Sequence, residues 1–206
     1  MPRKKKTIST KVLFNATNNK FFALLLGLLV GFVFYLREFT HHFTVVSPDL
    51  DVEICFTPPS GCREVIINKI NLAKKSIHMQ AYSFTSKPIY EALENAARRG
   101  VNVNILLDKS QLTEPNTIYK PSLPSTSLIH IDIDRSVKGI AHNKVIIIDD
   151  LFTITGSYNF SNGAEFRNAE NVVIIKNKDI TKEYKNNWQF HYYENKLLTL
   201  PNKILP

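Results

Sequence analysis

Two polar residues, spaced two positions apart, begin the most informative stretch of the sequence. His142 and Lys144 open the run His-Asn-Lys-Val-Ile-Ile-Ile-Asp, whose apolar part predicts a buried strand. Alternate side chains of a strand project from the same face, so the imidazole and the ammonium group should lie together. Ser157 and Asn159 repeat this spacing on the next extended segment, after Gly156, which allows close backbone approach. A histidine nucleophile beside a fixed positive charge suits a phosphodiester anion.

The full pattern reads His-x-Lys-x4-Asp-x6-Gly-Ser-x-Asn over 18 residues, and it resembles the signature of the phospholipase D superfamily. The resemblance continues through Asn168-Ala-Glu-Asn171 and a C-terminal helix that carries Trp188. Two upstream segments, Cys55-Phe-Thr-Pro-Pro-Ser-Gly-Cys62 and Met79-Gln-Ala-Tyr82, look like those of small exported phospholipase D proteins of the rickettsial type. These proteins belong to the same superfamily as the short bacterial endonucleases. The match covers roughly residues 50–193.

The resemblance implies a mechanism and assigns a role to each motif residue. His142 would attack phosphorus and form a phosphohistidine that water then resolves. Lys144 and Asn159 would hold the non-bridging oxygens, and Ser157 would support the phosphate. Glu170 would hold the second nitrogen of His142 and fix its tautomer, as the orienting acid of a catalytic triad does. The competing interpretation of Glu170 is a solvated carboxylate in a turn.

Asp149 belongs to the same catalytic motif, but its position predicts a structural role. It lies seven residues after His142, so on an unbroken strand it faces away from the reactive side chains. We expect it to tie the motif loops together and not to transfer protons. The other histidines lack a lysine two residues on: His78 is expected to be a core or supporting residue, and His130 and His191 have no supporting constellation.

The chain contains one copy of the motif, whereas larger superfamily members carry two. The chemistry needs one histidine to attack and another to protonate the leaving oxygen. A homodimer that places two His142 side chains across a two-fold axis would supply both, with a shared active site. The resemblance implies no metal ion and no cofactor, and the sequence offers no convincing carboxylate cluster for a metal.

The net charge of +8 resides mostly in the N-terminus. Residues 1–36 contain six basic residues and no acid, which leaves 20 basic and 18 acidic residues in the remainder. Residues 37–206 are therefore nearly neutral, and this gives poor support for a nucleic-acid-binding surface.

An uninterrupted apolar run of sixteen residues, 21–36, lies between Lys20 and Arg37. As a helix it would span about 24 Å, somewhat short of the roughly 30 Å hydrocarbon core, and its basic flanks could snorkel. The positive flank should remain cytoplasmic, which sends the remainder across the membrane. The segment is either a signal peptide or an uncleaved anchor, and a buried core helix is the competing interpretation. We therefore expect an exported protein, secreted or periplasmic, with membrane anchoring if the segment is retained.

Cys55 and Cys62 are the two cysteines of the chain. In an oxidising compartment the pair favours a disulfide across a short loop. Two reduced thiols remain an alternative, as does a zinc site with His41 and His42, although the spacing is not typical of one.

Hydrophobic periodicity predicts an α/β fold: a mixed central sheet flanked by helices, like that of phospholipase D, preceded by the apolar N-terminal helix. A polar loop at 109–127, a candidate access lid, interrupts the alternation. The domains expected are 1–36 (signal peptide or signal anchor), 37–50 (linker), 51–196 (catalytic domain) and 197–206 (tail). Strands are expected at 51–56, 77–83, 101–108, 128–134, 144–149, 152–155 and 171–176, and helices at 63–76, 87–99 and 179–193.

The substrate is less well determined than the chemistry. The resemblance, the export and the near-neutral body favour a phospholipase D that hydrolyses phosphatidylcholine-like lipids to phosphatidate and a free head group. A nonspecific endonuclease is the alternative, because the pocket itself recognises only a phosphate. A membrane-tethered, non-catalytic nucleic-acid-binding module is the alternative from another class.

Overall fold

The computed structural model describes residues 23–32, 51–119 and 128–199. Residues 23–32, inside the predicted apolar run, are helical. In the part of the chain that the structure describes, no helix has the length and apolar character needed to cross a membrane. The remainder of the predicted N-terminal segment, the predicted linker and His41 and His42 lie outside the described residues. The described residues from 51 onward belong to one compact unit.

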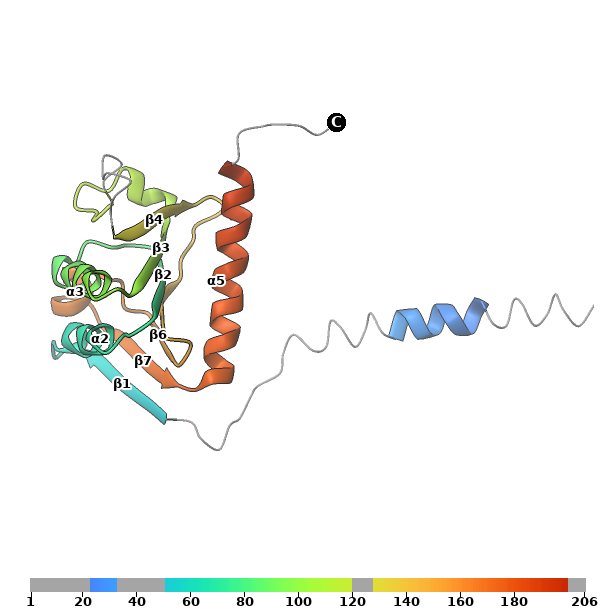
Figure 1. Ribbon diagram of the computed structural model, residues 1–206, viewed down its shortest axis with the longest axis horizontal. Helices are drawn as coiled ribbons and strands as arrows, with labels where there is room; N and C mark the ends of the chain where they lie inside the picture. Colours follow the sequence, from blue (N-terminus) through green and yellow to red (C-terminus); the bar gives the residue numbers. More distant parts are fainter. Residues whose placement is uncertain (1–22, 33–50, 120–127, 200–206) are drawn as a thin grey trace, which may run out of the picture. The chain divides into compact units, whose positions relative to one another are not determined.

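The described part of this unit is built on a seven-stranded mixed sheet (Figure 1). Its strand order is β1-β7-β6-β5-β2-β3-β4, with β2, β3 and β4 mutually parallel and the remaining neighbours antiparallel. The predicted mixed sheet is therefore confirmed. The strands are β1 (Asp51–Thr57), β2 (Ser76–Ala81), β3 (Asn102–Asp108), β4 (Ile129–Asp134), β5 (Lys144–Ile148), β6 (Phe152–Gly156) and β7 (Glu170–Lys176).

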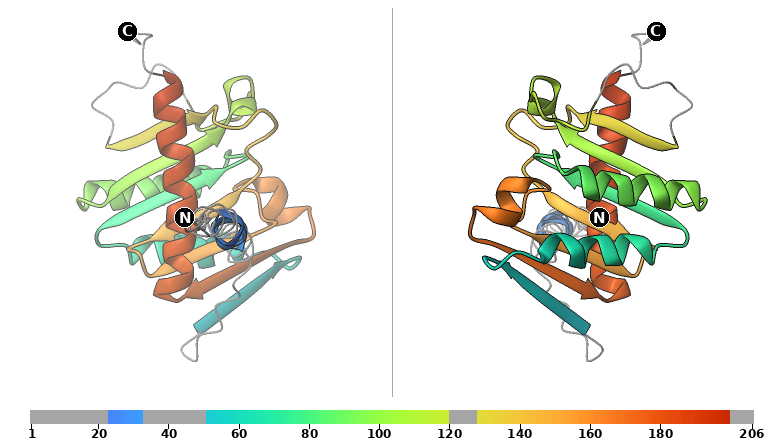
Figure 2. Two further views of the ribbon diagram at one scale, coloured as in Figure 1. Left: turned by 90° about the vertical axis from the view of Figure 1, so that its right-hand side faces the viewer. Right: turned by 90° about the vertical axis from the view of Figure 1, so that its left-hand side faces the viewer.

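Helices cover both faces of the sheet, as predicted. The helices α2 (Cys62–Asn71) and α3 (Lys87–Arg98) pack side by side on one face, and α5 (Lys178–Thr199) crosses the other (Figure 1). Two short elements lie at the ends of strands, the 3₁₀ helix η2 (Lys109–Leu112) and α4 (Asn162–Phe166), and neither was predicted. The helix η2 follows directly on β3, and α4 lies between β6 and β7, at the same edge of the sheet (Figure 2).

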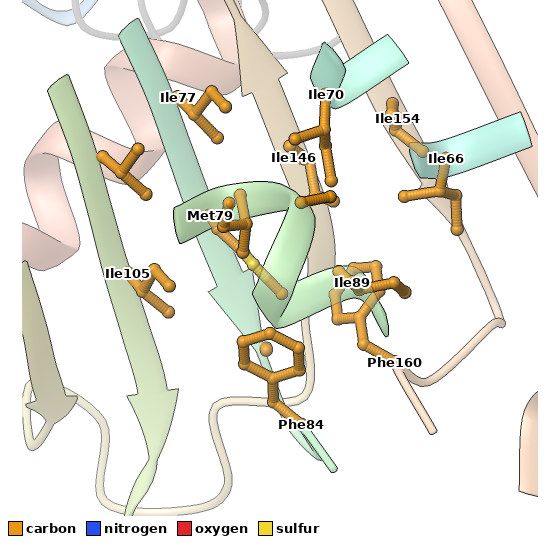
Figure 3. Close-up of a cluster of buried hydrophobic side chains, with 14 of the residues drawn as sticks. Ile66, Ile70, Ile77, Met79, Phe84, Ile89, Ile105, Ile146, Ile154 and Phe160 are labelled. Carbon is orange, nitrogen blue, oxygen red and sulfur yellow. The ribbon is translucent and has the colours of Figure 1, made fainter. Parts of the chain in front are cut away.

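Strand alternation divides the buried side chains between two layers. Ile77 and Met79 of β2 and Ile146 of β5 pack with α2 and α3 in the larger core (Figure 3). Val145 and Ile147, the intervening residues of β5, join Leu106 and Trp188 in a smaller cluster beneath α5. A five-residue strand buried on both sides explains the continuous apolar run after Lys144.

Three predicted boundaries are corrected by the structure. The helix expected at 63–76 ends at Asn71, because the backbone N–H groups of residues 74–76 donate to the carboxylate of Asp149 and cannot continue the helix. The predicted loop at 109–127 begins with η2. The last helix continues to Thr199, past the end expected at residue 193.

Candidate active site

The motif residues meet at one edge of the sheet because of strand direction. β5 runs antiparallel to β2, so the C-terminal end of β2 lies beside the start of β5. β6 is antiparallel to both β5 and β7, which brings the end of β6 and the start of β7 to the same edge. We call this the motif edge. In both views of Figure 2, the connection from β4 to β5, the helix α4 and η2 lie along it.

Lys144 is the first residue of β5 and is buried, with 8% of its surface exposed. Its ammonium group donates a 2.7 Å hydrogen bond to the backbone carbonyl of His142. Burial lowers the pKa of Lys144, and the carboxylate of Glu170 opposes that shift. The ammonium of Lys144 is thus bonded to the main chain of His142, with the histidine exposed and the lysine buried, and the predicted pairing of the ammonium with the imidazole stays a prediction.

Tyr82 contacts both of these residues from the end of β2. Its ring centroid lies 4.5 Å from that of His142, and the ammonium of Lys144 lies 5.0 Å from the same ring centroid. The backbone N–H of Tyr82 donates to the carbonyl of Asn143 at 3.0 Å, which fixes the strand end against the motif. In the sequence, Tyr82 is marked only by the resemblance of the segment Met-Gln-Ala-Tyr, which assigns it no role. Its position near the end of a predicted strand was the available signal for a role at the site.

Ser157 and Glu170 are hydrogen-bonded to each other. The hydroxyl of Ser157 donates to Oε2 of Glu170 at 2.5 Å and accepts from the backbone N–H of Asn171 at 3.1 Å. The other oxygen of Glu170 accepts from the side-chain amide of Asn168 at 3.0 Å. Within the described residues, no hydrogen bond joins Glu170 to His142. In this single chain the carboxylate influences Lys144 electrostatically and its oxygens are engaged by Ser157 and Asn168, so the contact with His142 stays a prediction.

Gly156 makes this close approach of β6 and β7 possible. Its φ is +143°, and a Cβ at this position would collide with the backbone carbonyl oxygen of Asn171. A side chain would push the strand ends apart and move Ser157 away from Glu170. The glycine of the motif is thus required by backbone geometry.

Asn159 lies two residues further along, at the entry to α4. Its Oδ1 is buried and has no hydrogen-bond partner among the described residues. Buried polar atoms in folded proteins are usually paired, and an unpaired one costs about 1–3 kcal/mol. The amide of Asn159 is therefore not fully committed to holding the fold.

The buried Glu165 holds the segments around Asn159 in place, and sequence reasoning missed it. Its carboxylate accepts from the backbone N–H groups of Gly61 at 2.6 Å and Arg63 at 3.0 Å, and from the hydroxyl of Tyr158 at 2.8 Å. One side chain thus joins the start of α2, α4 and the residue between Ser157 and Asn159. No local pattern in the sequence distinguishes it from a solvated helix carboxylate.

Asp149 lies at the opposite end of β5 from His142. Its carboxylate accepts three backbone hydrogen bonds, from Lys74 at 2.8 Å, Lys75 at 2.7 Å and Ser76 at 2.9 Å. Burial raises the pKa of Asp149, but the three N–H donors outweigh burial and leave the pKa below its ordinary value. These bonds tie the chain before β2 to the end of β5, as the position of Asp149 predicts, while a catalytic part for this residue stays untested.

The remaining histidines lie in structural surroundings. His78 packs against Trp188 with 4.5 Å between ring centroids, and its pKa is lowered chiefly by burial. Nδ1 of His191 lies 2.9 Å from the hydroxyl of Ser136 and 3.1 Å from the carboxylate of Asp134. His130 is exposed on β4. In the described segments, no three His, Cys, Asp or Glu side chains are grouped so that they could hold a metal ion.

Cys55 and Cys62 form a disulfide, with 5.6 Å between their Cα atoms. The bond joins edge strand β1 to the first residue of α2. Close by, the hydroxyl of Thr57 donates to the carbonyl of Ala164 at 2.9 Å. These interactions attach β1 and α2 to α4 at the motif edge.

Comparison with known proteins identifies relatives of this arrangement. Residues 66–191 match the family model described as cardiolipin synthase, PLD-like domain. A phospholipase D of Rickettsia conorii is 50% identical over 137 residues, which cover 66% of this chain and 67% of the relative. A phospholipase D of Rickettsia typhi is 39% identical over 193 residues and covers 83% of this chain and 93% of the relative.

Two solved structures have the same fold. Nuc from Salmonella typhimurium, described as a phospholipase D family member, superposes with a TM-score of 0.61 at 34% identity, over 71% of this chain and 96% of its own. NucT from Helicobacter pylori superposes with a TM-score of 0.63, over 71% of this chain and 98% of its own. Its 23% identity supports the likeness of fold alone.

Proposed function

This chain belongs to the phospholipase D superfamily, and we propose that it hydrolyses phosphatidylcholine-like lipids to phosphatidate and a free head group. As a member of that superfamily it is a phosphodiester hydrolase. The choice of a lipid is supported by its similarity, over most of its length, to a protein named phospholipase D.

The observation that carries the proposal is the buried Lys144, whose ammonium donates to the backbone carbonyl of an exposed His142. An anion at His142 would lie next to a positive charge that is shielded from water, where electrostatic attraction is stronger than in bulk solvent. The side-chain N–H of Asn159 and, once it turns away from Glu170, the hydroxyl of Ser157 come from the adjacent connection and would donate to the remaining phosphate oxygens. A phosphodiester is the anion that this set of groups fits.

The reaction proceeds in two displacements without a metal ion. A ring nitrogen of His142 attacks phosphorus, a nitrogen–phosphorus bond forms, and the bond to the head-group oxygen breaks as that oxygen accepts a proton. Water then attacks the phosphohistidine and gives a proton to the group that protonated the head group, the nitrogen–phosphorus bond breaks, and the product is phosphatidate. Tyr82 and Lys144 position the attacking ring, and Lys144 stabilises charge that develops on the phosphate oxygens.

The proton for the leaving oxygen requires a second acid, which we assign to the partner's His142 in a homodimer with a shared site. His78 and His191 are unsuited, because both are packed or hydrogen-bonded away from the motif edge. Export through the N-terminal segment, with that segment cleaved or retained as an anchor, is part of the same proposal and places the enzyme outside the cytoplasm.

The test is to offer purified protein labelled phosphatidylcholine and, separately, single- and double-stranded DNA, all in the presence of EDTA. Release of the head group without DNA cleavage supports the proposal. DNA cleavage without lipid hydrolysis would establish an endonuclease, and DNA binding without cleavage of any substrate would establish a non-catalytic module. His142→Asn should abolish turnover and His130→Asn, at an exposed histidine outside the motif edge, should not.

A further inference from the structure

Three segments border the motif edge, and each pairs an exposed apolar side chain with a nearby cation. They are η2 with Lys109 and Leu112, the connection from β4 to β5 with Lys138 and Ile140, and the end of α4 with Phe166 and Arg167. The apolar side chains are 45% (Leu112), 57% (Ile140) and 64% (Phe166) exposed, and the three cations are also exposed. We call these six residues the rim.

The structure holds the rim segments in position. The carboxylate of Asp108, directly before η2, accepts from the backbone N–H of Ala141 at 2.6 Å, one residue from His142. The ammonium of Lys109 donates to the carbonyl of Lys138 at 2.8 Å and joins η2 to the β4–β5 connection. The guanidinium of Arg63 lies 4.9 Å from the ring centroid of Phe166.

The charge of these segments has one sign. Residues 109–113, 135–143 and 166–169 contain no aspartate or glutamate. Large apolar side chains next to lysine or arginine, on segments without acids, have the composition of protein surfaces that enter the interfacial region of an anionic bilayer. Each apolar side chain would leave water for the acyl boundary, while the adjacent cation would face lipid phosphates.

We propose that the rim is a docking surface for an anionic phospholipid bilayer, which delivers the lipid phosphodiester to His142. This inference rests on the proposed lipid substrate and adds the surface from which the substrate is taken. A nucleic acid would match the cations but not the aliphatic side chains of Leu112 and Ile140, which gain nothing from phosphate. In the proposed homodimer the two His142 side chains meet across a two-fold axis, so the rims of the two copies would border one shared site.

A tryptophan reporter tests docking without requiring catalysis. The chain has a single tryptophan, Trp188, which is buried and provides a constant background. In the full-length protein, Phe166→Trp should give an emission that shifts to the blue when vesicles of phosphatidylcholine with phosphatidylglycerol are added. Phe190→Trp is the matched control, since Phe190 is 60% exposed on α5. The local reporter responds to the rim even if the N-terminal segment binds the same vesicles.

The expected result is a shift for the Phe166 reporter alone, weakened by high salt because part of the attraction is electrostatic. Equal shifts at both positions, or none with vesicles, would overturn the proposal. A shift produced by DNA but not by vesicles would make the rim a nucleic-acid surface. A shift that depends only on protein concentration would make it a contact between copies.

A hydrolysis assay separates the rim from the chemistry. The triple variant Leu112→Ser, Ile140→Ser, Phe166→Ser should lower the rate on vesicle phosphatidylcholine at least tenfold, relative to the rate on the soluble diester bis(p-nitrophenyl) phosphate. The matched triple Phe190→Ser, Tyr193→Ser, Leu197→Ser removes side chains of similar exposure from α5 and should change that ratio less than about twofold. An unchanged ratio in the rim variant refutes docking. A wild-type protein inactive on both substrates refutes the proposed function. The emission of the Phe166→Trp reporter still shows whether the rim binds vesicles.

Discussion

Asp149→Asn should destabilise the protein while leaving its chemistry intact. The carboxylate ties the chain before β2 to the end of β5 through three backbone N–H donors. Hydrogen bonds to charged groups contribute about 1.5–3 kcal/mol each when buried. The Asp149 site is only half-buried, so water would replace part of what is lost. The asparagine retains one acceptor oxygen and tolerates the φ of +55° at this position, which leaves a loss of about 2 kcal/mol.

Asp150→Asn is the matched control, because it is the adjacent residue and has a φ of +56°. Asp150 pairs with Lys185 at 2.7 Å, but its side chain is 55% exposed. An exposed ion pair of this kind contributes about 0–1 kcal/mol. The two variants make the same chemical change in the same turn, so their difference isolates the three backbone hydrogen bonds.

The assay is thermal and urea denaturation followed by circular dichroism, with diesterase activity measured at a temperature where both variants are folded. A loss of about 2 kcal/mol corresponds to a lower Tm by roughly 4–8 °C for a domain of this size. The pKa of Asp149 is lowered in the folded protein, so its stabilisation is complete above the unfolded pKa of about 3.9 and disappears as the pH falls through the lower folded value. The Asp149→Asn penalty should therefore be full at pH 7 and should shrink below about pH 4. Unchanged stability with a hundredfold loss of turnover would refute the structural role.

Four further outcomes follow from the site. Tyr82→Phe should retain most activity, and Tyr82→Ala should lower kcat about tenfold with the fold intact by circular dichroism, because the ring contacts both His142 and Lys144. In a pH–rate profile, activity should fall as the pH rises through the lowered pKa of Lys144, and Lys144→Arg should move that alkaline limb upward; an unmoved limb would assign it to another group. Replacing both Cys55 and Cys62 by serine should cost about 2.5 kcal/mol in urea denaturation, as expected for a short disulfide loop, and an unchanged midpoint would contradict this. Mixing His142→Asn with wild-type chains should lower activity faster than the wild-type fraction, because one histidine is missing from each mixed dimer, and a strictly linear fall would mean that another group protonates the leaving oxygen.

Much of the fold was predictable because it follows from periodicity. Alternating or continuous apolar runs locate the strands to within two residues, and the predicted C-terminal helix with Trp188 covers the second face. The elements that were missed have few residues or depend on distant partners. The N–H of Ala164 donates to the Ser161 side chain at the start of α4, and Asp108 caps η2, but each element is about one turn long and has no hydrophobic repeat.

The position of a site residue was predictable where it depends on its spacing along a strand. It was not predictable where it depends on hydrogen bonds to residues distant in the sequence. Strand alternation predicts that the side chains of His142 and Lys144 lie near each other, and both contact the ring of Tyr82. The hydrogen bonds of Glu170 to Ser157 and Asn168, and those of Glu165 to two amides and a tyrosine, depend on how β6, α4 and β7 fold back. No spacing in the sequence encodes them.

One end of β5 stabilises the fold, and the other end belongs to the proposed reaction site. At one end the Asp149 carboxylate has three backbone donors and a lowered pKa, so it is stable as an anion and gains little from a ligand. At the other end Lys144 is buried with its pKa also lowered, and Oδ1 of Asn159 is without a partner in the described chain. A buried cation is stabilised by any anion that approaches it, so a phosphate at His142 would lower the free energy of the motif edge itself. Binding of a phosphate should accordingly raise the pKa of Lys144, whereas it should leave Asp149, at the far end of the strand, unaffected.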